Sequence, residues 1–161
     1  MISPEPVNNH LKAFQEIVPS LPRRAIREFG VYNGDSTAQL VTFGRSVYAF
    51  DTFQGMPEIG FEKEMDWDNP PGKFKPTHDV EAFLKTIGVT TFKGRFEDTL
   101  PTVNKKVKFA FVYIDCDWYS GHKEIITWLM ETKRMVEGGV ALLDDYLVLE
   151  GARRGDRKSV V

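Results

Sequence analysis

Two short acidic clusters each follow an apolar run of the chain. Asp115 and Asp117 end one run, and Asp144 and Asp145 end another. Carboxylate oxygens are preferred ligands of Mg²⁺, which keeps several waters when it binds a protein. If the two runs are neighbouring strands, Asp115, Asp144 and Asp145 can converge on one divalent cation. Asp117 lies just past its strand, where it could act as a general base beside the metal.

A glycine-containing turn, EFGVYNGDS (residues 28–36), lies earlier in the chain. Glycines there let a ligand approach the backbone closely, although the spacing is not that of the dinucleotide fingerprint. Asp51 ends the next apolar segment, about 20 residues on, and a carboxylate at that place can accept from both ribose hydroxyls. Together these features favour an adenosine-containing cofactor that has no pyrophosphate.

Each acidic residue also has a simpler interpretation, because Asp is common in the turns that end strands. Asp117 could merely favour the dipole of a helix beginning near Ser120. The simpler interpretation is weakest for the set as a whole, since many like charges along one rim repel unless a cation or hydrogen-bond donors are present.

The histidines and the single cysteine are weaker candidates for a functional site. His10, His78 and His122 do not have the spacing of a zinc site and are expected at the surface. Cys116, the only cysteine, is expected to pack on the side of its strand opposite to the flanking aspartates. A single cysteine allows no internal disulfide, which favours a reducing, cytoplasmic location.

Hydrophobic periodicity predicts the elements that position these residues. Asp35 or Ser36 is expected to cap one helix, and Gly138-Gly139 to end the last one. The pattern predicts strands over 25–30, 46–50, 89–93, 108–114 and 140–143, and helices over 5–18, 35–43, 79–87 and 120–137. Such alternation predicts an α/β fold with a mainly parallel sheet and helices on both faces, whose ligands bind at the carboxyl ends of the strands.

The whole chain, 1–161, is expected to form a single domain with an N-terminal helical segment (1–22) and a polar tail (151–161). The segment 52–77 is rich in glycine, proline and aromatic residues and predicts a lid or substrate wall, with a plain surface excursion as the alternative. The net charge of −2 and pI near 5.9 predict no nucleic-acid or membrane partner.

Five ordered stretches carry a family resemblance: EFGVYNGDS, YAFDTFQGMPE, GRFEDTLP, FVYIDCDWYSGHKEI and VEGGVALLDDY. They span roughly residues 25–150 and resemble the macrocin O-methyltransferase (TylF/MycF/NovP) family. That family consists of S-adenosylmethionine- and Mg²⁺-dependent enzymes with a Rossmann-like class I methyltransferase fold. Such enzymes methylate hydroxyl groups of sugars and other natural products, so a small-molecule hydroxyl acceptor is the implied partner.

The resemblance also implies roles for individual residues. The methionine end of S-adenosylmethionine would be held by Glu28, Gly30 and Ser36. Its ribose would be bound by Asp51, and its adenine would be bordered by Arg95 and Phe96. The implied metal ligands are Asp115, Asp144 and Asp145, and the implied general base is Asp117.

The chain departs from the family pattern at its C-terminal end. Methyltransferases of this fold usually have seven strands, but only 15 residues follow Tyr146, so the last two strands are expected to be missing. The strand at 140–143 would then be an apolar edge, which a second copy of the chain could cover.

Two alternatives stay open: a truncated domain that binds S-adenosylmethionine without turnover, and a haloacid-dehalogenase-like Mg²⁺-dependent phosphatase, in which the first Asp of an Asp-x-Asp motif is a nucleophile.

Overall fold

A parallel sheet forms the centre of the computed structural model, which describes residues 9–58 and 70–144. Its strand order is β3-β2-β1-β4-β5, and every neighbouring pair is parallel. The strands are β1 (Ala25–Phe29), β2 (Val47–Asp51), β3 (Thr90–Lys93), β4 (Phe109–Ile114) and β5 (Met135–Leu143). All six residues of β4 are buried, as its continuous apolar sequence predicts for a strand covered on both faces.

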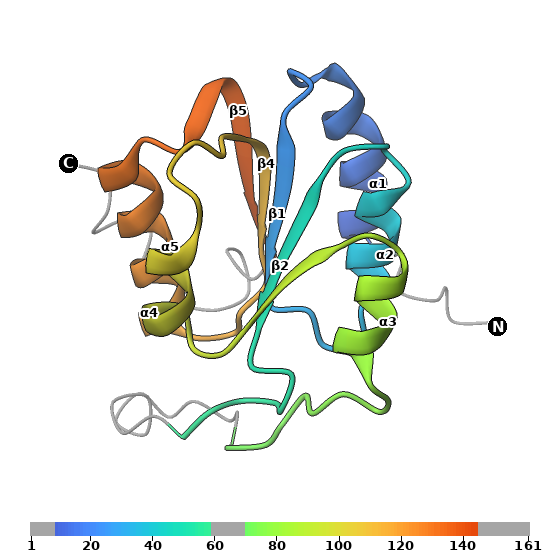
Figure 1. The fold of residues 1–161 in the computed structure, drawn as a ribbon, viewed down its shortest axis with the longest axis vertical. Coiled ribbons are helices and arrows are strands. Elements are labelled where there is room, and N and C mark those ends of the chain that lie inside the picture. Colours follow the sequence, from blue (N-terminus) through green and yellow to red (C-terminus); the bar gives the residue numbers. More distant parts are fainter. Residues whose placement is uncertain (1–8, 59–69, 145–161) are drawn as a thin grey trace, which may run out of the picture.

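Helices cover the sheet on both faces (Figure 1). One face packs against α1 (Asn9–Ile17), α2 (Asp35–Val41) and α3 (Val80–Thr86), through a core that includes Phe14, Leu40 and Leu84. The other face packs against α4 (Phe96–Thr99) and α5 (Tyr119–Thr132), through a core that includes Phe96, Ile125 and Leu129. Short 3₁₀ turns follow α1 and α4, at Val18–Ser20 and Leu100–Thr102. The predicted α/β class and the three-layer arrangement are confirmed.

The predicted end of the last helix is wrong. The helix stops at Thr132 with Lys133 in the left-handed conformation (φ 49°), and β5 already begins at Met135. Arg134 is buried, and its guanidinium donates to the carbonyls of Asn104 (2.6 Å) and Val103 (3.2 Å), which turns the chain back to the sheet.

The glycines at 138–139 therefore lie inside a strand rather than at a helix end. Phe109 pairs with Met135, but Phe111 pairs with Val140, so β5 bulges between those partners. Gly138 has a positive φ of 74° in this bulge, a conformation that glycine adopts without steric cost.

The predicted cap of α2 is also wrong. Gly34, with φ 86°, occupies the N-cap position and makes no side-chain cap hydrogen bond. The Ser36 hydroxyl donates to the Glu28 carboxylate instead, so a long-range contact replaces the local cap.

The predicted N-terminal helix is present from Asn9 to Ile17, while Val7 and the polar tail at 151–161 lie outside the described residues. The described sheet has five strands, and residues 145–161 are not part of that description. None of the described helices combines the length and apolar character needed to cross a bilayer.

Candidate active site

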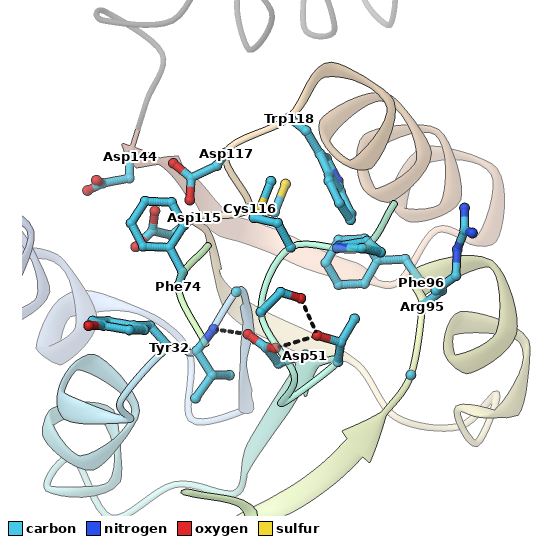
Figure 2. Close-up of a pocket in the computed structure, with 17 residues that line it drawn as sticks. Tyr32, Asp51, Phe74, Arg95, Phe96, Asp115, Cys116, Asp117, Trp118 and Asp144 are labelled. Atoms are coloured by element: carbon cyan, nitrogen blue, oxygen red, sulfur yellow. Dashed lines mark hydrogen bonds between the residues drawn. The ribbon is translucent and has the colours of Figure 1, made fainter. Parts of the chain in front are cut away.

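A cavity opens at the carboxyl ends of β1, β2, β4 and β5, the edge at which ligands bind in parallel α/β sheets (Figure 2). Its wall includes carboxylates that end or follow three strands, aromatic rings from three loops, and the aromatic ring at the start of α4. The lining residues include Gly30, Tyr32, Asp51, Phe74, Arg95, Phe96, Asp115, Asp117, Trp118 and Asp144.

Asp115 and Asp144 lie at one end of this cavity (Figure 2). Both follow neighbouring strands, since Ile114 of β4 pairs with Leu143 of β5. Their oxygen donors suit a hard cation such as Mg²⁺. Asp145, the third predicted ligand, lies outside the described residues. Within residues 9–58 and 70–144, no group of three or more His, Cys, Asp or Glu side chains forms a metal-binding cluster.

Asp117 lines the same cavity, two residues beyond Asp115. Its backbone has a φ of 58°, in the left-handed region that non-glycine residues seldom adopt. A neighbouring residue, Trp118, is the N-cap of α5. The carboxylate therefore lies close to the helix N-terminus and also faces the cavity, so the two interpretations of Asp117 are compatible.

Asp51 connects the glycine turn to the loop after β2. Its Oδ2 accepts from the Val31 amide and its Oδ1 accepts from the Phe53 amide, both at 2.7 Å. Oδ1 has one further, longer contact, from the Thr52 hydroxyl at 3.4 Å, whereas Oδ2 retains a second lone pair to which a ligand hydroxyl can donate. This carboxylate lies away from the Asp115 end of the cavity in Figure 2.

Glu28 and Ser36 do not reach the cavity wall. The Glu28 side chain is fully buried, its Oε1 accepts from the Ser36 hydroxyl, and its Oε2 has no hydrogen-bond partner among the described residues. Burial raises the pKa of Glu28 to about 7; the nearby hydroxyls of Ser36 and Thr37 lower it, and the negative charge of Asp51 raises it further. The hydrogen bond between Ser36 and Glu28 connects the first and last residues of the glycine turn (28–36).

Gly30 lines the cavity and has a φ of 84°. A Cβ at this position would lie 1.7 Å from the backbone oxygen of Asp115. The absence of a side chain is thus required by the close approach of the turn to the end of β4, whatever the ligand.

Arg95 and Phe96 both border the cavity, but they present different groups to it. The Arg95 guanidinium pairs with Glu97 (2.9 Å) and points away from the acidic end in Figure 2. Phe96 is buried and meets Phe29 and Trp118 edge to face, at centroid distances of 5.5 and 6.3 Å. The buried rings of Phe96 and Trp118 make an apolar wall suited to a flat base.

The described parts of the 52–77 segment, 52–58 and 70–77, form another wall of the cavity. Met56 exchanges backbone hydrogen bonds with Lys73 and Gly72, both at 2.8 Å. Phe74 packs edge to face on Tyr32 at 5.8 Å, and both rings line the cavity while remaining 38% and 46% exposed. These parts of the segment therefore border the cavity, while the lid interpretation stays a prediction; residues 59–69 lie outside the description.

The sequence did not single out Tyr113, a buried residue of β4. Its hydroxyl donates to Asp115 Oδ2 (3.2 Å) and also interacts with the Asp144 carboxylate. Burial, together with the negative charges of Asp115 and Asp144, raises the pKa of Tyr113 far above its usual range. Its position two residues before Asp115 was the available signal, because alternation places residues i and i+2 on one side of a strand.

The expectation that all three histidines lie at the surface is wrong for His122. Its side chain is fully buried in α5, and its Nδ1 lies 2.8 Å from the Trp118 carbonyl and 3.3 Å from Cys116 Sγ. Burial lowers the pKa of His122. Cys116 is buried as predicted, in the core between the sheet and α5, but it also lines the cavity together with its flanking aspartates. His10 lies 3.7 Å from Asp144, while His78 is exposed.

Comparison with known proteins decides the family. The model of the family described as Macrocin-O-methyltransferase (TylF) matches residues 12–158, which is most of the chain. The chain belongs to the TylF family. It is 31% identical over 139 residues to a Streptomyces olivaceus protein named 8-demethyl-8-(2,3-dimethoxy-alpha-L-rhamnosyl)-tetracenomycin-C 4'-O-methyltransferase, and the match covers 75% of this chain.

Two solved structures share the fold of this TylF-family chain. CalS11, a calicheamicin methyltransferase, has a TM-score of 0.79 at 20% identity, covering 93% of this chain and 68% of that one. The O-methyltransferase NovP has a TM-score of 0.72 at 21% identity, covering 92% and 69%. The chain spans 52% of the length of the Streptomyces relative.

Proposed function

We propose that this chain carries the cofactor and metal sites of an S-adenosylmethionine-dependent, Mg²⁺-dependent O-methyltransferase that acts on a hydroxyl of a sugar or related natural product. One observation carries the proposal: a single cavity contains Asp51, an apolar wall and three further carboxylates, Asp115, Asp117 and Asp144. The Streptomyces relative, named for methylation of a rhamnosyl compound, supports a sugar-bearing acceptor.

The residues divide into a cofactor side and an acceptor side. Asp51 would accept from the ribose hydroxyls, Gly30 would lie beside the cofactor, and Arg95 and Phe96 would border the adenine. Glu28 and Ser36 would act from behind the glycine turn by fixing its shape. Asp115 and Asp144, with Asp145, would hold Mg²⁺.

When both groups are bound, the sulfonium supplies an electrophilic methyl group and the metal lowers the pKa of the acceptor hydroxyl. The protein then has to align the acceptor oxygen with the methyl group, which is mainly a matter of positioning. Asp117 would take the acceptor proton. The exposed rings of Tyr32 and Phe74 offer an apolar surface against which a sugar or an aromatic aglycone could pack.

Calorimetry tests this proposal most directly. S-adenosylmethionine is titrated into the 161-residue chain with and without Mg²⁺, and methyl transfer to rhamnose-bearing glycosides is then followed. Binding with Mg²⁺-dependent transfer supports the proposal. Asp144→Ala is expected to weaken Mg²⁺ binding but to spare the cofactor, and unchanged Mg²⁺ affinity in that variant would contradict the metal assignment.

A non-catalytic S-adenosylmethionine-binding domain is the second candidate, because the cofactor-side residues Gly30, Asp51 and Phe96 line the cavity whether or not methyl transfer follows. Cofactor binding with no methyl transfer to any acceptor, with or without Mg²⁺, would favour it. Phosphatase activity without cofactor affinity would point to the haloacid-dehalogenase alternative. A cytoplasmic location, the absence of nucleic-acid and membrane partners and a homo-oligomer that covers the β5 edge stay predictions.

A further inference from the structure

Tyr113 links the two carboxylates that the structure places at the candidate metal site. Its side chain is fully buried on the α1 side of β4. The hydroxyl donates to Asp115 Oδ2 at 3.2 Å and interacts with Asp144, which follows the neighbouring strand. One phenol therefore contacts an acidic residue at the end of β4 and another at the end of β5.

Helix α1 holds the Tyr113 ring in place. The buried Phe14 ring meets it edge to face, at a centroid distance of 4.9 Å and an interplanar angle of 79°. His10, one turn earlier on α1, lies over the same ring at 5.7 Å, and its Nδ1 is 3.7 Å from Asp144 Oδ1. Because Phe14 and His10 pack against the Tyr113 ring, the ring has little freedom to move. Its hydroxyl is therefore fixed relative to the carboxylates of Asp115 and Asp144.

A phenol has one proton and can donate fully to only one of the two carboxylates at a time. Both side chains offer carboxylate oxygens, the type of ligand that a hard divalent cation prefers. In protein metal sites, ligating carboxylates are themselves hydrogen-bonded by outer residues, and those residues contribute to metal affinity.

From this geometry we propose that Tyr113 is a positioning residue that orients Asp115 and Asp144 toward one divalent cation, and that α1 stabilises it in that role. The inference rests on the metal site of the proposed function. Tyr113 acts only through the two carboxylates, and no direct bond to the metal is implied.

Mn²⁺ binding to the full chain tests this role, with free Mn²⁺ measured by electron paramagnetic resonance. Tyr113→Phe keeps the ring and its contacts with Phe14 but removes the hydroxyl. We expect its Mn²⁺ dissociation constant to rise by roughly 10- to 100-fold, the usual effect of losing an outer-shell hydrogen bond. Its affinity for S-adenosylmethionine, measured by calorimetry, is expected to stay within about twofold of wild type because Asp51 and Phe96 are untouched.

Tyr48→Phe is the matched control. It removes the same hydroxyl from a tyrosine on the opposite face of the sheet, where the ring packs against Phe92 and Phe109. Its Mn²⁺ affinity should be unchanged. Equal Mn²⁺ affinity of Tyr113→Phe and wild type, or equal losses in the two variants, would overturn the inference.

Loss of S-adenosylmethionine affinity in Tyr113→Phe, in parallel with Mn²⁺, would indicate general damage and would also overturn it. A wild-type chain that binds no Mn²⁺ would remove the metal site and this inference together. A wild-type chain that binds Mn²⁺ without methyl transfer counts against the proposed activity alone.

Discussion

At the scale of single residues, the carboxylates in and near the cavity have distinct surroundings. Asp51 is committed to two backbone amides, Asp115 to the Tyr113 hydroxyl, and Glu28 is buried behind the turn. Asp117 differs from all of these because its backbone is held in the left-handed region while its side chain faces the cavity. Such strained positions cluster at functional sites, which fits a proton acceptor there.

Asp117→Asn tests the role of this residue as a base. The amide has nearly the same shape but cannot accept a proton at neutral pH, so methyl transfer should fall by about 100-fold or more. Affinities for S-adenosylmethionine and Mg²⁺ should stay close to wild type, because Asp117 is assigned to neither. Turnover of the Asn variant at the wild-type rate would contradict the assignment.

Glu28 predicts a pH dependence of stability. Its pKa is about 7 in the folded chain against an ordinary value of 4.5, so the folded state binds more protons than the unfolded state between these values. The contribution of Glu28 is therefore complete below pH 4.5 and is lost as the pH rises through 7. Over that range the free energy of unfolding should fall by up to about 3 kcal/mol from this group.

Urea denaturation between pH 5 and 8 measures this slope. In Glu28→Gln the slope should flatten, because the amide does not titrate. Asp35→Asn, which removes a carboxylate from the exposed start of α2, serves as the control and should retain the wild-type slope. A Glu28→Gln variant with an unchanged slope would show that another group titrates.

At the scale of elements, the first turn of α5 and its N-cap residue, Trp118, shape the cavity through one close contact. A Cβ on Gly121 would lie 1.6 Å from Nε1 of Trp118, whose buried indole lines the cavity. Gly121 belongs to a helix, where alanine is ordinarily the better residue by about 1 kcal/mol. Glycine is therefore required at this position by the nearby indole of Trp118 and not by the helix itself.

Gly121→Ala should lower the free energy of unfolding by about 1–3 kcal/mol, since the indole must move within a packed region. It should also weaken S-adenosylmethionine binding, because Trp118 forms part of the apolar wall. In a Trp118→Phe background the smaller ring leaves room for the methyl group, so a double-mutant cycle should show strong coupling in stability. Additive effects in that cycle would contradict the steric explanation.

At the scale of the whole molecule, an unusual charge lies in the core between the sheet and α5. Arg27 of β1 is fully buried, and none of its guanidinium nitrogens has a hydrogen-bond partner among the described residues. Phe109, Phe50 and Trp128 surround it, at 4.0, 4.3 and 4.5 Å from the guanidinium carbon to the ring centroids. Burial, with a smaller effect from Arg134, lowers the pKa of Arg27 to about 8.

Cation–π contacts of this kind contribute about 0.5–2 kcal/mol, which is less than the several kcal/mol that desolvation of a buried ion costs. Arg27→Met, a flexible apolar replacement, should therefore raise the free energy of unfolding by about 1–3 kcal/mol in urea denaturation at pH 7. Arg27→Lys keeps a charge that is more strongly hydrated and should lower stability. A less stable Met variant would show that the aromatic cage compensates the buried charge.

The sequence by itself determined the layered α/β fold and the rim on which the acidic residues gather. These features depend on local periodicity and on the rule that parallel strands place their carboxyl ends at one edge. The family blocks predicted Asp51, Phe96, Asp115, Asp117 and Asp144 as site residues, and all five line one cavity. Their individual roles stay predictions.

Only the tertiary structure decided which side chains meet across elements. In the structure, Ser36 forms a hydrogen bond with Glu28, and the glycines at 138–139 lie in a strand bulge. His122 is buried rather than exposed. The tertiary structure also brought the Tyr113 hydroxyl into a hydrogen bond with Asp115 and an interaction with Asp144, which lies 29 residues further along the chain. Periodicity cannot predict such contacts, because they depend on strand register and on the packing of helices that are distant in sequence.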